Sequence, residues 1–233
     1  MKGILVGSNA RQEWLLPWWW ERYCRHNRYP VTFADFGLSQ EKKKWCQERG
    51  SLLSICKSPF FVKDRNDVEG RFVEEWESKY PDTFWESRDA WFKKPQACLQ
   101  TPYEQTIWLD IDCEVVQPLD DLFSFGIGLA VDSIASAQSV DFLIYNSGVI
   151  SFQKNHPLIV EWATLSFEKN GCFRGDQDLL SHIIAEKKIS VHKLDPIYNW
   201  SIGEGENPRV VIYHWLGDVA KRCLQNSLIL NDL

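Results

Sequence analysis

Short apolar runs rich in β-branched residues alternate along this chain with longer segments of helical periodicity, and this alternation constrains the fold more than any other feature. In the first segment of helical periodicity, residues 11–28, Pro17 either kinks the helix or marks its real start near Trp18. Strands that alternate with helices predict an α/β fold with a mixed, mainly parallel sheet flanked by helices. The predicted strands are residues 3–7, 31–36, 52–55, 106–111, 127–131, 142–152, 189–194 and 209–214. The predicted helices are residues 11–28, 40–49, 70–80, 88–100, 158–168 and 176–187.

The length of the chain fits a single domain. At about 150 residues per domain, 233 residues correspond to one large domain or to two closely merged halves. The sequence has no internal repeat, no low-complexity tract and no long linker, and its most loop-like stretch is residues 203–206. We therefore predict one domain over residues 1–233.

The charge of the chain restricts its partners. A net charge of −6 and a pI near 5.4 argue against an electrostatic nucleic-acid binder, which usually carries a basic face. Phosphates can still bind at a local site that a metal neutralises. The apolar run 14–20 contains Pro17 and ends at Glu21, so no transmembrane segment is expected, although peripheral membrane contact is left open.

The cysteines predict the compartment. They are scattered without any C-x-x-C pair, a pattern typical of reduced thiols in a cytoplasmic protein and not of a disulfide framework or a zinc site. The run at residues 4–6 is too short for the core of a signal peptide. The seven cysteines are Cys24, Cys46, Cys56, Cys98, Cys113, Cys172 and Cys223.

The segment 106–115 has the sharpest chemical pattern. Its apolar run predicts a buried central strand that ends in Asp110 and Asp112, two carboxylates that project to the same side if the strand geometry persists. Two like charges at a buried strand end repel each other unless a cation joins them, and hard oxygen ligands suit Mg²⁺ or Mn²⁺. Ligands bind at strand carboxyl ends in open α/β sheets. The alternative is an ordinary solvated strand-to-loop transition.

Three further segments add polar groups. The strand 142–152 contains Asn146, Ser147 and Gly148, where a glycine marks either the close approach of a ligand or a β-bulge. Asp176, Gln177 and Asp178 open the helix 176–187, where acids also serve as helix caps. His214 ends the strand 209–214 and is followed by Gly217 and Lys221; a lone histidine there is also compatible with a structural role.

The order of these motifs resembles the family-eight glycosyltransferases and their GT-A relatives. It runs from D-x-D through N-S-G-V, D-Q-D and Leu194–Trp200 to H-x-x-G with a following lysine, and Ala90–Pro95 upstream is also similar. The resemblance covers roughly residues 88–221. It implies a GT-A-like, Rossmann-type fold with a nucleotide-binding half over 1–112 and an acceptor and sugar half over 113–233. It also implies a hexosyltransferase-type glycosyltransferase that uses a nucleotide-sugar donor, a UDP-sugar above all, with Mn²⁺ or Mg²⁺ and with retention at the anomeric carbon.

The resemblance also assigns roles to individual residues. It places the metal on Asp110, Asp112 and His214. Asp176 and Gln177 would be the catalytic residues that contact the donor sugar near the reacting carbon. The remaining donor-binding residues would be Gly7, Ser8 and Asn9 for the nucleoside, Asn146, Ser147 and Gly148 for the sugar and acceptor, and Lys94, Gly217 and Lys221. The acceptor itself, whether glycan, lipid, protein or small molecule, is unspecified.

Two departures mark a divergent branch. One extra residue separates Gly217 from Lys221, and Arg222-Cys223 stand where the family has Pro-Trp. The first strand also lacks the family's Asp-rich loop. Two alternatives are a haloacid-dehalogenase-like phosphatase, against which Glu114 replaces the usual Thr or Val, and a non-catalytic nucleotide- or carbohydrate-binding protein.

The tryptophans are expected to lie mostly in the core. Three consecutive tryptophans on one helix, residues 18–20, cannot all face the same way, so at least one is expected to be exposed or at a partner surface. Trp200 and Trp215 are the better candidates for ligand contact.

Overall fold

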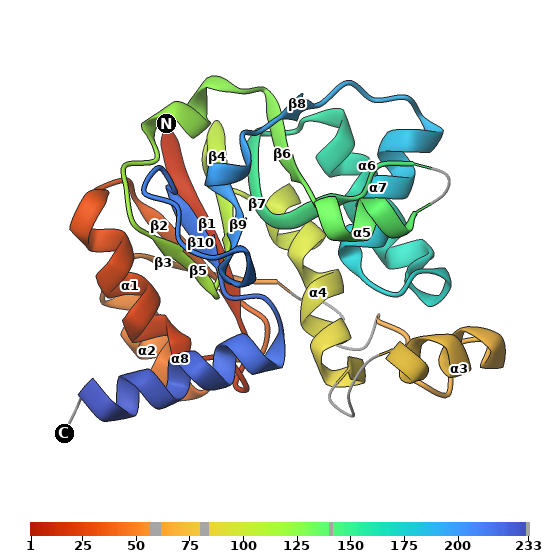
Figure 1. Cartoon of the computed structure of the whole chain (residues 1–233), viewed down its shortest axis with the longest axis horizontal. Helices are drawn as coiled ribbons and strands as arrows, with labels where there is room; N and C mark the ends of the chain where they lie inside the picture. Colours follow the sequence, from red (N-terminus) through yellow and green to blue (C-terminus); the bar gives the residue numbers. More distant parts are fainter. Residues whose placement is uncertain (56–61, 80–83, 140–141, 232–233) are drawn as a thin grey trace.

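A seven-stranded mixed sheet forms the centre of the molecule (Figure 1). The computed structural model describes residues 1–55, 62–79, 84–139 and 142–231. The strand order is β3-β2-β1-β4-β7-β6-β8, and only the pairings of β7 are antiparallel. The strands are β1 (Lys2–Ser8), β2 (Val31–Asp35), β3 (Ser51–Ser54), β4 (Gln105–Asp110), β6 (Ile127–Val131), β7 (Tyr145–Gln153) and β8 (His192–Lys193).

A second, three-stranded sheet lies beside the first and has the order β5-β10-β9. Its strands are β5 (Cys113–Val115), β9 (Trp200–Ser201) and β10 (Ile212–His214). β5 and β10 are antiparallel, and His214 lies opposite Cys113. Because β5 begins three residues after the end of β4, this pairing brings His214 next to the carboxyl end of β4.

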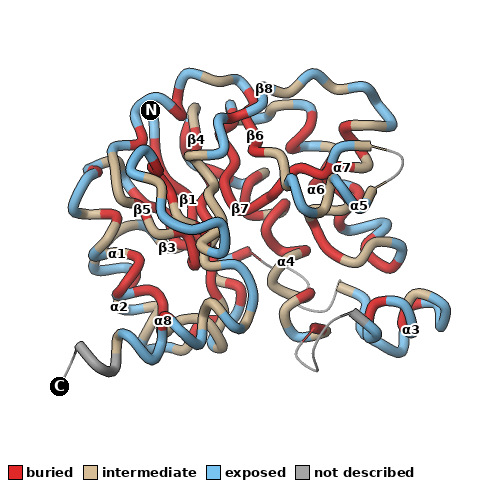
Figure 2. The backbone as a smooth tube through the Cα atoms, viewed as in Figure 1, coloured by how far each residue is buried: buried red, intermediate tan, exposed pale blue. Residues whose placement is uncertain are grey.

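The alternation of side chains along the strands divides the core into two layers. On β1, Ile4 and Val6 pack on the side of α1, whereas Leu5 belongs to the opposite core, which α4, α6 and α7 cover. Figure 2 shows the buried residues concentrated along these strands. The helices are α1 (Leu15–His26), α2 (Gln40–Gln47), α3 (Gly70–Lys79), α4 (Phe84–Leu99), α5 (Ser133–Gln138), α6 (Pro157–Glu168), α7 (Asp176–Glu186) and α8 (Gly217–Asn231). Short 3-10 turns are η1 (Asp120–Ser124), η2 (Asn170–Cys172), η3 (Pro196–Tyr198) and η4 (Ile202–Glu204).

Helix α1 is anchored by its tryptophans. Trp18 and Trp19 are buried, and Trp20 is half-buried against Phe33 and Trp45, so the expected exposed member of the triplet does not exist. Trp45 on α2 provides the aromatic surface that the sequence pattern did not reveal. Helix α1 begins at Leu15, four residues after the predicted start at residue 11 and three residues before the alternative start near Trp18. Pro17 lies in its first turn, where its missing N–H costs no intrahelical hydrogen bond.

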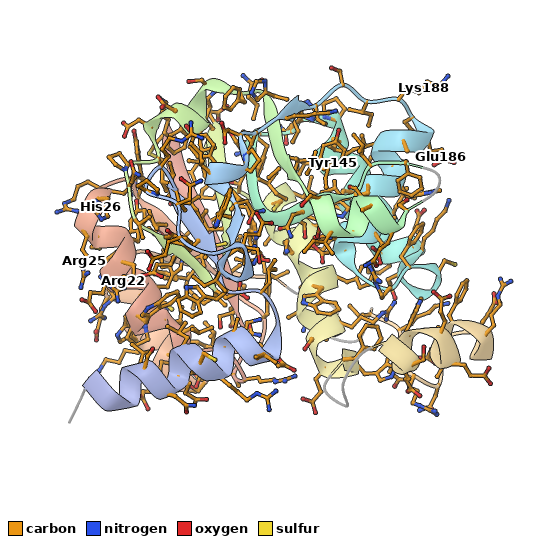
Figure 3. The ribbon with its side chains drawn as sticks, in the orientation of Figure 1. Arg22, Arg25, His26, Tyr145, Glu186 and Lys188 are labelled. Carbon is orange, nitrogen blue, oxygen red and sulfur yellow. The ribbon has the colours of Figure 1, made fainter. Side chains whose placement is uncertain are left out.

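The outer side of α1 carries basic residues. Arg25 and His26 occupy its last turn, where cations interact favourably with the helix dipole (Figure 3). Arg22 lies one turn earlier, and its Nε is 3.2 Å from Glu114 Oε1. This ion pair connects α1 to β5 and helps to fix the small sheet.

Several predicted boundaries differ from the structure. Strands β5 and β9 and helices α5 and α8 were not predicted, α4 begins four residues before the predicted position, and β7 begins at Tyr145 and not at residue 142. Tyr80 of the predicted helix 70–80 lies outside the described residues, as does Cys56. The other six cysteines are free thiols. Among the described residues, no helix is both long enough and apolar enough to cross a membrane.

Candidate functional site

A cavity of about 530 Å³ opens at the carboxyl end of β4, between α4, the start of α7 and α8. It collects residues that are far apart in the sequence. Of the residues singled out from the sequence, those that line it are Lys94, Asp110, Asp112, Asn146, Ser147, Gly148, Asp176, Gln177, Asp178, His214, Gly217 and Lys221.

Three potential metal ligands meet in this cavity. Asp110 is the last residue of β4, and Asp112 follows in the turn to β5. His214 Nε2 lies 3.3 Å from Asp112 Oδ1 and 4.0 Å from Asp110 Oδ2. Carboxylate oxygens of both aspartates therefore lie within 4.0 Å of the same imidazole nitrogen. Asp112, Cys113 and His214 can each place one ligand atom within 4.8 Å of the other two, a grouping that does not include Asp110. The Cys113 thiol also contacts the carbonyl of Gly148 at 3.7 Å.

The ring of His214 is held by a chain of amides. His214 Nδ1 is 2.8 Å from Asn199 Oδ1, and Asn199 Nδ2 donates to Asn146 Oδ1 at 2.8 Å. Asn146 Oδ1 also accepts a hydrogen bond from the backbone N–H of Gly148. When His214 is neutral, a proton on Nδ1 that is shared with Asn199 leaves the lone pair of Nε2 directed at the carboxylates.

Gly148 allows the imidazole to approach the sheet. A Cβ at this position would lie 2.1 Å from Cε1 of His214, well inside van der Waals contact. The glycine in this strand thus marks a close approach, here by the histidine side chain. No larger residue fits at position 148 without displacing His214.

The indole of Trp108 orients Asp110. Trp108 is 1% exposed, and its Nε1 donates to Asp110 Oδ1 at 2.7 Å. Lys94 Nζ is 2.9 Å from the same oxygen and 3.1 Å from Oδ2. Trp108 on β4 and Lys94 on α4 therefore both donate to the carboxylate of Asp110, and its Oδ2 also faces His214.

Two lysines compensate the buried carboxylates. Lys221 Nζ on α8 is 2.8 Å from Asp112 Oδ2. Burial favours the neutral form of Asp112, but the charges of Lys221 and His214 outweigh burial and hold the pKa of Asp112 well below its ordinary value. Burial also opposes the charge of Lys94, yet Asp110 and Asp176 raise its pKa, so this lysine stays a cation.

Asp176 and Gln177 begin α7 and face β7. Asp176 Oδ2 is 3.1 Å from Lys94 Nζ and accepts a hydrogen bond from Ser147 Oγ at 2.8 Å. Gln177 Oε1 accepts from the backbone N–H of Ser147, and its Nε2 donates to Asp132. Burial raises the pKa of Asp176, and Lys94 offsets only part of this effect. Lys94 thus links the D-x-D strand to the start of α7.

The loop after β1 contributes differently from the prediction. Gly7, Ser8 and Asn9 are not among the described residues that line the cavity, where Gln12 represents this loop. The space above Gly7 is filled by the rings of Phe36 and Trp108, because a Cβ there would lie 2.3 Å and 2.8 Å from them. Asn9 instead accepts a hydrogen bond from the backbone N–H of Gln12. The cavity gives no support to the predicted nucleoside contact of these three residues.

The predicted ligand-contacting tryptophans lie elsewhere. Trp200 donates to the carbonyl of Gly205 and Trp215 to Glu114, and neither lines the cavity. The aromatic lining comes from Phe84 and Trp91 on α4. Sequence reasoning also missed the cavity residues Gln12, Ser87, Asp132 and Arg174.

The residues present fit a divalent cation. Two carboxylates and one imidazole nitrogen form a donor set that suits Mn²⁺ or Mg²⁺. Both the imidazole and Asp110 are oriented by hydrogen bonds from a second layer of residues, as is usual for metal ligands.

The fold matches solved glycosyltransferase structures. The galactosyltransferase LgtC, solved in complex with donor and acceptor sugar analogues, matches with a TM-score of 0.65 and 15% identity, over 93% of this chain and 87% of LgtC. Mouse xyloside xylosyltransferase 1 gives 0.57 and 14% identity, over 92% of this chain and 97% of that chain. The glycosyltransferase GlyE of Streptococcus pneumoniae TIGR4 gives 0.61 and 16% identity, over 93% of this chain and 55% of GlyE. No family model matches the sequence, and no curated protein matches it.

The chain therefore has a glycosyltransferase fold. The predicted GT-A-like, mixed α/β architecture is confirmed, and so is the structural resemblance to family-eight enzymes that the motif order implied.

Proposed function

We propose that this protein is a metal-dependent glycosyltransferase that moves a sugar from a nucleotide-sugar, with a UDP-sugar as the expected donor, to an acceptor with retention. The observation that carries the proposal is the convergence of Asp110, Asp112 and His214 in one cavity with Asp176 and Gln177. In a glycosyltransferase fold, this arrangement combines candidate groups for the diphosphate and for the sugar.

The charge of the cavity supports a metal requirement. Six aspartates line it against four lysine and arginine side chains, so a donor diphosphate would enter a region of net negative charge. A divalent cation held by Asp110, Asp112 and His214 would offset this repulsion and stabilise the leaving nucleoside diphosphate. Lys221, which pairs with Asp112 in the cavity, would contact the phosphates.

The sugar end of the cavity is built from β7 and α7. Asp176 and Gln177 would bind hydroxyls of the donor sugar near the reacting carbon, and Asn146, Ser147 and Gly148 would line the path of the acceptor. Retention requires either a carboxylate nucleophile, for which Asp176 and Asp178 are the candidates, or front-face attack, in which the leaving phosphate accepts the proton of the acceptor. We propose that Asp176 positions the donor sugar, a role compatible with both routes.

The rival functions are less well supported. The fold match to glycosyltransferase structures does not favour a haloacid-dehalogenase-like phosphatase, which would form a covalent aspartyl phosphate. A non-catalytic binding protein would bind the nucleotide with metal but show no turnover.

A thermal-shift screen tests the proposal. UDP, GDP, CDP and ADP would each be added with and without Mn²⁺ to the wild type, to Asp112→Asn and to Asp67→Asn, an exposed carboxylate outside the cavity. A ligand that binds only the folded state at about 100 times its Kd adds roughly 2.7 kcal/mol. We expect one nucleotide, UDP, to stabilise the wild type and Asp67→Asn only when Mn²⁺ is present, and to have no effect on Asp112→Asn.

Other results would point elsewhere. Stabilisation by a phosphate mimic with Mg²⁺, without any response to nucleotides, would favour the phosphatase. Metal-dependent binding of UDP without consumption of UDP-glucose or UDP-galactose, with sugar acceptors or with water, would favour the binding protein.

A further inference from the structure

Arg88 is a fully buried cation that the proposed chemistry does not use. It lies on α4 with no exposed surface, and no carboxylate of the described residues pairs with it. Burial lowers the pKa of Arg88 to about 10, which still leaves it charged at neutral pH. Its guanidinium lies over the rings of Phe92, Trp76 and Trp85, at 4.8, 5.0 and 5.5 Å from their centroids.

Backbone carbonyls take the place of a counter-ion. Arg88 Nη1 donates to the carbonyl of Lys63 at 2.6 Å, and Nε donates to that of Arg174 at 3.0 Å. Its Nη2 donates to the carbonyls of Asn170 and Phe173. One planar guanidinium thus holds two chain segments, one before α3 and one that leads into α7.

The same two segments also bind each other. The backbone N–H of Lys63 donates to Asn170 Oδ1 at 2.8 Å, and a Cβ at Gly171 would lie 2.7 Å from the side chain of Lys63. The second segment continues through Arg174 and Gly175, both at the cavity, into Asp176. The path from Arg88 to the start of α7 is therefore two residues long.

We infer that Arg88 is the positioning residue that sets the sugar-binding wall of the cavity, because it fixes the backbone from Asn170 to Arg174 and thereby the side chains of Asp176 and Gln177. This inference rests on the proposed function. It assigns discrimination of the donor sugar to a residue that touches no ligand, and it leaves the metal and diphosphate end to β4, β10 and α8.

The geometry explains why other side chains would not replace Arg88. A lysine has the same charge but a single ammonium, which cannot reach four carbonyls spread around a planar fork. A methionine fills similar volume but leaves those carbonyls without a donor, so the segment 170–174 should loosen in both variants.

The test compares Arg88→Met and Arg88→Lys with the wild type and with Tyr23→Phe. The control variant removes the hydroxyl of Tyr23 on α1, which is buried and donates to the backbone carbonyl of Tyr29. Amide hydrogen exchange is measured first. We expect faster exchange at residues 62–65 and 170–178 in both Arg88 variants, with the strands of the central sheet still protected, and neither change in Tyr23→Phe.

Calorimetry with Mn²⁺ then compares UDP with UDP-glucose and UDP-galactose. We expect the Arg88 variants to bind UDP within about twofold of the wild type and to bind the preferred UDP-sugar roughly tenfold more weakly. A tenfold loss corresponds to roughly one hydrogen bond to a charged group. In the Arg88→Ala variant, millimolar ethylguanidine should restore part of the lost affinity for the UDP-sugar.

Two results would overturn the inference: exchange that rises across the whole sheet, or affinities for UDP and UDP-sugar that fall together. A wild type that binds no nucleotide would overturn the proposed function and with it the role in sugar discrimination. That failure is distinct, because it appears in the wild type and not only in the variants.

Discussion

Replacement of Trp108 by phenylalanine tests how the candidate metal ligands are held. The change keeps an aromatic ring in the core but removes the N–H that binds Asp110 Oδ1 at 2.7 Å. Among the described residues, only Lys94 would then donate to this carboxylate. Asp110 would be free to turn toward the lysine and away from His214.

The magnitude follows from the lost contact. A hydrogen bond to a charged acceptor contributes about 1.5–3 kcal/mol, which corresponds to roughly 10- to 150-fold in an equilibrium constant. Loss of an outer-shell partner of a metal ligand typically costs about 10- to 100-fold in affinity. We therefore expect Trp108→Phe to bind Mn²⁺ at least about tenfold more weakly than the wild type.

The chain offers a matched control in Trp19. It is as deeply buried as Trp108, but its Nε1 has no hydrogen-bond partner among the described residues. Trp19→Phe therefore loses the same ring volume and no hydrogen bond. Titration with Mn²⁺, followed by calorimetry or by the electron paramagnetic resonance of the free ion, gives the affinities of both variants.

The comparison has a clear negative result. If Trp108→Phe and Trp19→Phe bind Mn²⁺ within twofold of each other, the indole N–H does not orient Asp110, and the reasoning on this second layer of contacts is wrong.

Four further predictions follow from the same contacts. Asn199→Leu should weaken Mn²⁺ binding about 10- to 100-fold, measured by calorimetry, because the ring of His214 loses its partner on Nδ1. Gly148→Ala should abolish Mn²⁺ binding while the far-ultraviolet circular dichroism is retained; unchanged affinity would show that the histidine can move aside at no cost. Asp176→Asn should lose sugar transfer yet bind UDP with Mn²⁺ as the wild type does, and full transfer by this variant would contradict the proposed role. Burial would raise the pKa of Asp35, but hydrogen bonds to its carboxylate lower this pKa below the ordinary 3.8. The ionised form of Asp35 therefore stabilises the fold above about pH 4, and this contribution is lost as the pH falls through the folded-state pKa. Asp35→Asn should thus cost roughly 1–2 kcal/mol in urea unfolding at pH 7 and close to nothing near pH 2, and an equal cost at both values would contradict the sign.

The central strand was predictable because local pattern and tertiary role coincide there. A continuous apolar run that ends in Asp110 and Asp112 predicts both a buried strand and its carboxyl end, and the structure has both. β5 and β9 have only three and two residues, and they exist through their pairing with β10, so no local periodicity reveals them.

The same distinction applies to the candidate site, where local motifs indicated some residues and only tertiary contacts bring in the others. The order of the motifs predicts that Asp110, Asp112, Asp176 and His214 lie together, and these four residues line one cavity. The residues that orient them carried no signal of their own. Trp108 reads as one more apolar position of a strand, although its spacing of two from Asp110 puts both side chains on one side. Asn199 lies within the segment Leu194–Trp200, but only the turn that follows η3 brings it to His214.

Arg88 was beyond sequence reasoning for a physical reason. Its partners are backbone carbonyls, which every residue has, so no pattern of side chains announces the contact. For Gly7, Ser8 and Asn9 the local sequence did suggest a site, for a nucleoside, but the tertiary structure does not provide the space. A glycine at a strand end suggests room for a ligand, but aromatic rings from β4 and the end of β2 fill that room.

The antiparallel pairing of β5 with β10 has an evolutionary consequence. The pairing puts Cys113 opposite His214, and the backbone N–H of Trp215 donates to the carbonyl of Asp112 at 3.0 Å. Backbone hydrogen bonds therefore fix both ends of the segment between Asp112 and His214 next to these two candidate ligands. The surface loops of this segment can therefore change in length or composition over generations, while the spacing of the candidate metal ligands Asp112 and His214 is inherited unchanged.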